Sequence, residues 1–151
     1  PNPVGQQRHL YPCSVYFACS ITGGREYESV YQAIAAALTE DGHEVPTAHL
    51  AGSDAGVREA ELGPQTVYRR DTDWIRACEV LIAEVSVPSH GVGYEIGFAL
   101  GLGKPVLALH QEGRKVSKMI SGNSDSKLTL RRYQTPSQAI EQMRSYLQGL
   151  K

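Results

Sequence analysis

The sequence predicts one α/β domain whose core is a parallel sheet with helices on both faces. Short apolar segments rich in β-branched and aromatic residues alternate with segments whose apolar residues recur at helical spacing. Glycine and proline lie at most of the junctions between them. A length of 151 residues suits one domain with a single ordinary core. In this class the crossovers are right-handed, and ligands bind at the carboxyl ends of the strands.

The composition and charge predict a globular protein that binds its ligand locally. A formal net charge of -1 provides no electrostatic attraction to nucleic acid or to a membrane surface. No apolar segment reaches the roughly 18 to 20 residues of a membrane span. The three cysteines, Cys13, Cys19 and Cys78, are odd in number and lack metal-ligand spacing. We therefore expect a reducing compartment, the cytoplasm or the nucleus, and no nucleic-acid or membrane partner.

The beginning of the chain contains a predicted arm, strand and helix. Residues 1–12 hold three prolines and little periodicity, so we expect a flexible arm before a domain over residues 13–151. Residues 13–19 are apolar and rich in strand-forming types, and a turn follows them. In residues 26–41 apolar side chains recur at helical spacing, and Gly42 lies where a helix ends.

The next segment predicts a weak strand, a loop and a helix. Residues 43–48 form a less regular second strand. Residues 52–63 combine small and charged residues without a core face, so we expect a mobile loop over a site. Residues 65–78 carry apolar side chains at helical spacing, and Asp71 falls on the same stripe. An acid in that position is a candidate for function.

The second half of the chain repeats the alternation of strand and helix. The strand at residues 79–85 is the clearest, because four consecutive apolar residues form its centre, and a helix at 91–103 follows it. The other elements are a strand at 104–109, a polar segment at 111–126 with a short helical piece, a strand at 127–133 and a capped helix from Thr135. Five strands in this order predict a Rossmann-like or flavodoxin-like sheet.

The segment at residues 86–97 is the best candidate for a binding site, because it ends a strand and begins a glycine-rich helix. Ser86 and Ser89 offer hydroxyl groups, and Gly91 and Gly93 allow close approach of the backbone beside a helix N-terminus. This combination predicts a phosphate site. The alternative is an ordinary strand-to-helix turn in which the glycines serve only the backbone geometry.

Three side chains are candidates for catalysis. We place Glu95 in the first helical turn, where the helix dipole favours the ionised carboxylate of a nucleophile or base. Asp71, which follows Arg69 and Arg70, is a second carboxylate. Pairs of carboxylates divide the acid and nucleophile roles in sugar chemistry. Asp73 is a neighbouring acid that could be a simple surface charge. Tyr16 comes from the first strand. The structural alternatives are a helix-stabilising Glu95 and a core Tyr16.

Other chemistries lack support in the sequence. The five histidines form no pair with metal-ligand spacing, and no local motif supports Cys19 as a nucleophile. The turn at residues 20–24 lacks the lysine of a nucleoside-triphosphate P-loop, and no G-x-G-x-x-G follows the first strand. We therefore expect neither a metal nor a cofactor.

Several separated motifs occur in one order along residues 13–147. They are Cys13-Ser-Val-Tyr-Phe with Ser20-Ile21 and Gly23-Gly-Arg-Glu26, Asp71-Thr-Asp-Trp74, Ala83-Glu-Val85 through Pro88-Ser89 to Gly91-Val-Gly-Tyr-Glu-Ile-Gly97, Gly103-Lys-Pro105, and Val116-Ser-Lys-Met-Ile120. Together they resemble the nucleoside 2-deoxyribosyltransferase family, most closely its 2′-deoxynucleoside 5′-monophosphate N-hydrolase branch.

The resemblance implies hydrolysis of an N-glycosidic bond without metal or cofactor. It makes Glu95 the nucleophile that attacks the anomeric carbon, with Tyr16 orienting it and Asp71 managing the proton of the departing base. The chemistry suits these residue types, because loss of a nucleobase builds oxocarbenium character that a carboxylate stabilises and then traps. Water then releases 2-deoxyribose 5-phosphate.

The resemblance also implies a phosphate site shared between the subunits of a homodimer. The residues implied in binding are Ser20, Ile21, Thr22, Gly23, Ser89, Gly91, Gly93 and Met119, together with Ser117 of the partner subunit. One departure is Thr22, where this branch often carries arginine, which would give a charge-assisted phosphate contact. Arg25 is the nearest cation that could replace it.

Two alternative functions stay open. A base-exchange transferase would use a second base in place of water, and it would yield a new nucleoside from two bases. A non-catalytic nucleotide sensor would bind without releasing base. The joint presence of Tyr16, Asp71 and Glu95 argues against the sensor.

Overall fold

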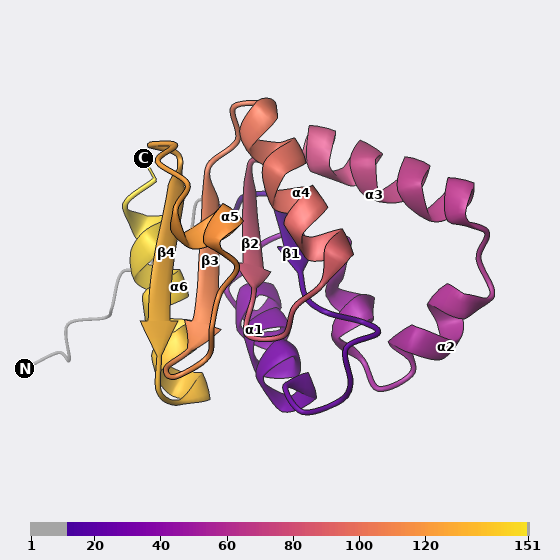
Figure 1. Ribbon diagram of the computed structural model, residues 1–151, viewed down its shortest axis with the longest axis horizontal. Coiled ribbons are helices and arrows are strands. Elements are labelled where there is room, and N and C mark those ends of the chain that lie inside the picture. Colours follow the sequence, from indigo (N-terminus) through magenta and orange to yellow (C-terminus); the bar gives the residue numbers. More distant parts are fainter. Residues whose placement is uncertain (1–11, 151) are drawn as a thin grey trace, which may run out of the picture.

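The parallel sheet has four strands in the order β1-β2-β3-β4, all parallel (Figure 1). The computed structural model describes residues 12–150, so the predicted arm lies outside it except for Pro12. The strands are β1 (Val15–Ala18), β2 (Val80–Glu84), β3 (Val106–Gln111) and β4 (Leu128–Tyr133). The helices are α1 (Glu28–Glu40), η1 (Ala48–Ala51), α2 (Ala55–Ala60), α3 (Pro64–Ala77), α4 (His90–Gly101), α5 (Lys118–Ser121) and α6 (Pro136–Gln148).

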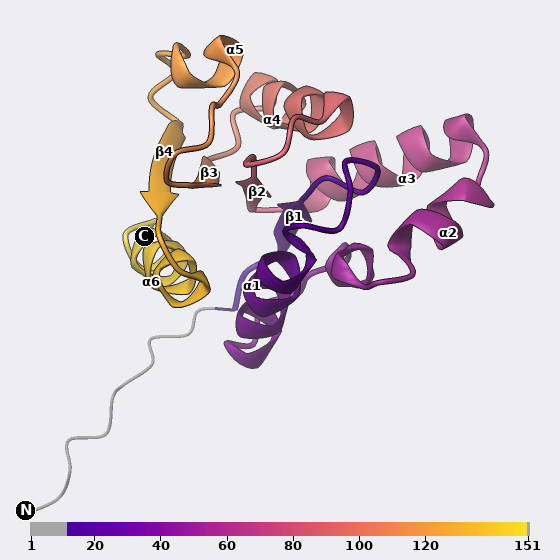
Figure 2. The same ribbon diagram turned by 60° about the horizontal axis from the view of Figure 1, so that its bottom comes forward.

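Helices cover both faces of the sheet, as the sequence predicts. Figure 2 shows α1 and α6 on one face and α3, α4 and α5 on the other. Alternation along β1 divides its side chains between two cores. Val15 and Phe17 pack with α1 and α6, whereas Tyr16 and Ala18 pack with the core that includes α3 and α4. Tyr16 is therefore placed on the face that carries α4.

The prediction of five strands is wrong, because residues 43–48 contribute only one isolated parallel bridge, between Ser14 and Glu44. Pro46 lacks an N–H group and cannot continue a ladder. The hydroxyl of Thr47 instead accepts a hydrogen bond from the backbone N–H of Phe17 at 3.0 Å. A side chain thus takes the place of the second strand, and the chain turns directly into η1.

The expectation of a loop without a core face at residues 52–63 is also wrong. This segment contains helix α2, and its first residue, Ala55, is buried. Glu59 near its end forms an ion pair with Arg70 of α3. The helix is short and has one small buried anchor, so its stability depends on a partner distant in sequence, which local periodicity does not reveal.

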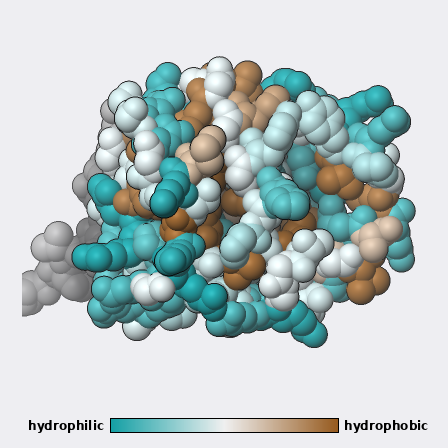
Figure 3. Space-filling view, in the orientation of Figure 1, coloured by the Kyte–Doolittle hydropathy of each residue, from teal (hydrophilic) through white to brown (hydrophobic). Residues whose placement is uncertain are grey.

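None of the helices within residues 12–150 combines the length and the apolar character needed to cross a membrane. Figure 3 shows hydrophobic residues interspersed with hydrophilic ones on the face that it draws.

Candidate active site

Tyr16 and Glu95 meet on the face of the sheet covered by α4. The Tyr16 hydroxyl donates a hydrogen bond to Oε2 of Glu95. Tyr16 is buried in β1, and Glu95 lies beside the buried residue Ile96, which packs α4 on the sheet. The contact therefore follows from strand alternation and helix packing, and it joins residues 79 positions apart.

Burial, and not the helix N-terminus, controls the ionisation of Glu95. Helix α4 begins at His90 and has no acid in its first turn, so the predicted first-turn position of Glu95 is wrong. Burial raises the pKa of Glu95 to about 7, although the hydrogen bond from Tyr16 opposes the shift, and the charge of Asp71 adds to it. The Glu95 carboxyl thus changes its protonation near neutral pH.

Asp71 supplies a second carboxylate to the same site. Its side chain is 19% exposed, and Oδ1 accepts a hydrogen bond from Nε of Arg70 at 2.8 Å. Burial raises the pKa of Asp71, and the guanidinium of Arg70 opposes this shift. Asp73, by contrast, lies at the surface and pairs with Arg76. The surface alternative therefore holds for Asp73 and not for Asp71.

The turn after β1 packs tightly against the turn after β2. A Cβ atom at Gly23 would lie 2.5 Å from both Oγ of Ser20 and Cγ1 of Val87, a separation that only glycine avoids. The Ser20 side chain is buried, and its Oγ accepts a hydrogen bond from the Gly23 N–H at 3.1 Å. Gly24 completes the turn with a φ of +100°. The two predicted phosphate turns thus form one surface.

Ser89 and Glu95 face the same space beside Gly91. Ser89 is the N-cap of α4, and its Oγ accepts a hydrogen bond from the Val92 N–H at 3.3 Å. A Cβ atom at Gly91 would lie 3.9 Å from Ser89 Oγ and 3.9 Å from Glu95 Oε1. Gly93 has no neighbour within 4 Å of its Cβ position, so packing does not require glycine there.

The remaining predicted phosphate residues lie at the surface or in the turn. Thr22 is exposed and Ile21 half-buried. Arg25 is 76% exposed and pairs with Glu28 at 2.8 Å. Ser117 caps α5 by accepting a hydrogen bond from the Met119 N–H, and Met119 is 84% exposed. Among residues 12–150, no hydrogen bond joins Ser117 to Ser89 within one chain.

Ser86 has a structural role instead of the predicted open hydroxyl. It is buried, donates to Oε2 of Glu84 at 2.8 Å and accepts from the Gln111 N–H at 2.8 Å. Tyr133 also donates to the Glu84 carboxyl, which is fully buried. The Glu84 network therefore ties together the carboxyl ends of β2, β3 and β4, and the loop that carries Ser89 starts from it.

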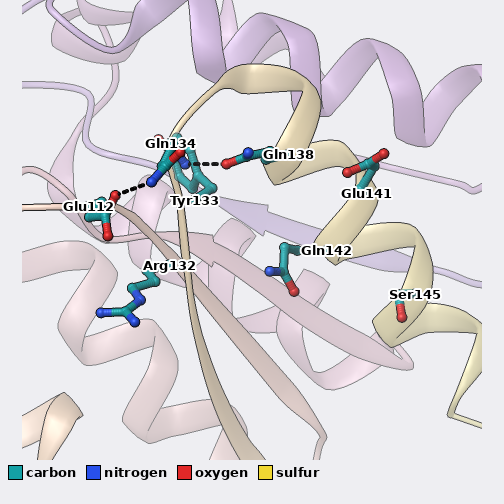
Figure 4. Close-up of a pocket in the computed structure, with 8 residues that line it drawn as sticks. All are labelled: Glu112, Arg132, Tyr133, Gln134, Gln138, Glu141, Gln142 and Ser145. Atoms are coloured by element: carbon teal, nitrogen blue, oxygen red, sulfur yellow. Dashed lines mark hydrogen bonds between the residues drawn. The ribbon is translucent and has the colours of Figure 1, made fainter.

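A cleft occurs at residues other than the Tyr16–Glu95 pair. It has a volume of about 560 Å³ and lies between the end of β4 and α6. Figure 4 shows two hydrogen bonds among its lining residues: the backbone N–H of Gln134 donates to the Gln138 side chain, and the Gln134 amide donates to Glu112. No cluster of three or more histidine, cysteine or acidic side chains suited to a metal occurs in the part of the chain that the structure describes.

Comparison with known proteins identifies the family. A family model described as nucleoside 2-deoxyribosyltransferase matches residues 15–143. The chain belongs to this family. A mouse protein named 5-hydroxymethyl-dUMP N-hydrolase is 48% identical over 120 residues, which cover 77% of this chain and 69% of that protein. A Methanosarcina mazei protein named putative 2'-deoxynucleoside 5'-phosphate N-hydrolase 1 is 40% identical over 131 residues, covering 87% and 79%.

A solved structure agrees with the fold of this deoxyribosyltransferase-family chain. The Clostridium botulinum CMP N-glycosidase aligns with a TM-score of 0.69 at 24% identity, covering 88% of this chain and 98% of that one. The family model confirms the predicted family, and this structural likeness confirms the predicted α/β class.

Sequence reasoning assigned no role to Glu59, Arg70 and Trp74. Arg70 pairs with both Asp71 and Glu59, and its guanidinium lies 4.9 Å from the Trp74 ring centroid. The spacing of Arg70 and Trp74, four residues apart on a helix, is a signal that could have indicated this stacking. Glu59 gave no such signal, because it lies on the helix that local periodicity did not reveal.

Proposed function

We propose that this chain hydrolyses the N-glycosidic bond of 2′-deoxynucleoside 5′-monophosphates to a free base and 2-deoxyribose 5-phosphate. The observation that carries the proposal is the hydrogen bond from Tyr16 to Glu95. Ser89 lies beside this pair, and the charge of Asp71 raises the pKa of Glu95. The names of relatives that are 40% to 48% identical support the same bond and substrate class.

The first step of the proposed reaction uses the two oxygens of Glu95 differently. Tyr16 occupies Oε2, which leaves Oε1, on the side of Gly91, to attack the anomeric carbon. The new C–O bond forms as the C–N bond breaks, and the bonding pair leaves with the base. Asp71 manages the proton that the base acquires. A raised pKa suits this task, because it allows Asp71 to hold a proton nearer neutral pH.

The second step releases the sugar. Water attacks the glycosyl ester, the sugar leaves as 2-deoxyribose 5-phosphate, and Glu95 returns as a carboxylate with the released proton passing to the solvent or Asp71. A transferase would place a second base where this water acts. The description of the family as transferases makes base exchange the second candidate.

The proposed phosphate site consists of the turn at residues 20–24, the Ser89 hydroxyl and the adjoining N-terminus of α4. The free N–H groups of a helix start and a serine hydroxyl are suitable donors to phosphate oxygens. Ser117 of the partner subunit would complete the site in a homodimer. The exposed Met119, Tyr94 and Leu102 support a subunit contact on the face of α4 and α5.

A substrate panel tests the proposed function. We expect chromatography to show free base and 2-deoxyribose 5-phosphate from deoxynucleoside monophosphates, and slower release from deoxynucleosides and ribonucleoside monophosphates. A second free base added to the reaction distinguishes the transferase, which would form a new nucleotide. Binding of the monophosphates without any release of base would contradict the proposal and favour the sensor.

A further inference from the structure

Arg70 is held in one place by groups from two helices. Its Nη1 and Nη2 donate to the two carboxylate oxygens of Glu59 at 2.8 and 3.0 Å, and its Nε donates to Asp71 at 2.8 Å. The guanidinium lies over the Trp74 ring. The side chains of Arg70 and Glu59 are only 20% and 13% exposed. A planar fork bonded on three nitrogens and stacked on an aromatic ring has little freedom to move.

The contact between Arg70 and Asp71 needs this support. Consecutive side chains on a helix point in directions about 100° apart and do not normally face each other. Trp74 is four residues beyond Arg70 and forms a surface on the same side of α3, while Glu59 approaches from α2. Together they bring the guanidinium to the position from which Nε reaches Asp71.

The bond from Arg70 makes the two oxygens of Asp71 unequal. Oδ1 accepts from Arg70 Nε, whereas Oδ2 has no hydrogen-bond partner among residues 12–150. A proton on the Asp71 carboxyl is therefore favoured on Oδ2, because the N–H of Arg70 already points at Oδ1. We infer that Arg70 is a positioning residue, which fixes the Asp71 carboxyl so that Oδ2 handles the proton of the departing base. This inference rests on the proposed function.

The charge of Arg70 also affects both acids of the site. It opposes the rise that burial causes in the pKa of Asp71 and of Glu95. The titratable groups that shift the pKa of Asp71 are Arg70, Glu59 and His49. Those that shift the pKa of Glu95 are Tyr16, Asp71, Arg70 and Glu59. Arg70 is the cation that offsets three carboxylates, so its loss is expected to raise the pKa of Glu95. The rise of kcat/KM with pH should then occur at a higher pH, because Glu95 attacks only when ionised.

Three variants separate position from charge. For Arg70→Met we expect kcat for a deoxynucleoside monophosphate to fall roughly 10- to 100-fold with KM little changed, together with the shift of the pH profile to higher pH. Arg70→Lys keeps the charge without the fork, so it should leave the pH profile near that of the unmodified chain and still lower kcat. Glu59→Gln removes the carboxylate that holds the Arg70 guanidinium, without changing Arg70 or Asp71 themselves, and should lower kcat by roughly threefold to tenfold.

Arg76→Met is the matched control, since Arg76 lies on the same helix, pairs with Asp73 at 3.0 Å and lies over Phe98. Thermal unfolding verifies that each variant folds. If Arg70→Met does not fold, the kinetics of Glu59→Gln provide the test. The inference is overturned if Arg70→Met and Glu59→Gln match Arg76→Met in kcat and pH profile, or if Arg70→Lys restores full kcat. Absence of base release by the unmodified chain would overturn the proposed function itself.

Discussion

At the residue scale, burial is the largest influence on the pKa of Glu95. A helix N-terminus stabilises a carboxylate by about 0.3 to 1 kcal/mol and acts within the first turn. Glu95 lies beyond that turn, and burial raises its pKa to about 7. The hydrogen bond from the Tyr16 hydroxyl and, to a smaller extent, the charge of Arg70 favour the ionised form of Glu95 against burial. The sequence predicted that the helix dipole acts on Glu95, whereas burial and the Tyr16 contact set its ionisation.

Tyr16→Phe should make Glu95 harder to ionise. The variant removes the hydrogen bond that lowers the pKa of Glu95, so this pKa should rise above about 7. Because the proposed reaction needs the carboxylate, the increase of kcat/KM with pH should move to higher pH, and the rate at pH 7 should fall roughly 10-fold or more. The measurement is a pH–rate profile, with Tyr146→Phe on the opposite face as control. An unchanged profile would show that Tyr16 does not control Glu95.

At the scale of elements, periodicity located the long helices and the apolar strands but not the pieces that depend on distant partners. Helices α1, α3, α4 and α6 and all four strands overlap the predicted segments, although α3 and α4 begin one residue earlier and β3 ends two residues later than predicted. The predicted second strand fails at Pro46, and its place is taken by one bridge and the Thr47 hydroxyl. Helix α2 was not predicted, because it is stabilised by an ion pair between its Glu59 and Arg70 of helix α3. The periodicity of apolar residues along the sequence does not reveal contacts between distant residues.

Gly23→Ala should disturb the packing between the two turns of the proposed phosphate site. The new Cβ would lie 2.5 Å from Ser20 Oγ and Val87 Cγ1, so these side chains or the turns that carry them must shift. We expect a loss of about 1 to 3 kcal/mol in the free energy of unfolding and a KM for monophosphates raised roughly 10-fold. Kinetics and urea unfolding measure both. Gly97→Ala is the control, because nothing lies within 4 Å of that position. A KM equal to that of the control would remove this turn from the phosphate site.

At the scale of the whole molecule, the buried Glu84 network connects the carboxyl ends of three strands. Glu84 is fully buried and bonds to Ser86 and Tyr133, and Ser86 bonds on to Gln111. The sheet thereby supports the loop that leads to Ser89. The sequence showed only a glutamate at the end of an apolar strand, since its partner Tyr133 is 49 residues away.

Tyr133→Phe should destabilise the fold in a pH-dependent way. Burial raises the pKa of Glu84, and the Tyr133 hydrogen bond opposes this rise. A carboxyl whose folded pKa is raised stabilises the fold less as pH increases through that pKa. Without the hydrogen bond from Tyr133, the pKa of Glu84 rises further. We therefore expect the free energy of unfolding to fall by about 1 to 3 kcal/mol at pH 8 and by less at pH 5. Urea unfolding at both pH values, with Tyr146→Phe as control, measures it. An equal loss at both pH values would contradict the role of Glu84.

The role of Glu95 as nucleophile is tested most directly by the rate of base release by Glu95→Gln, measured beside the binding of a deoxynucleoside monophosphate by calorimetry. Glutamine keeps the size of the side chain but is a far weaker nucleophile, so release should fall by roughly 1000-fold or more while binding stays within a few-fold. Glu141→Gln, at the surface of α6, is the matched control. Base release by Glu95→Gln within 10-fold of the unmodified rate would contradict the central claim that Glu95 attacks the sugar.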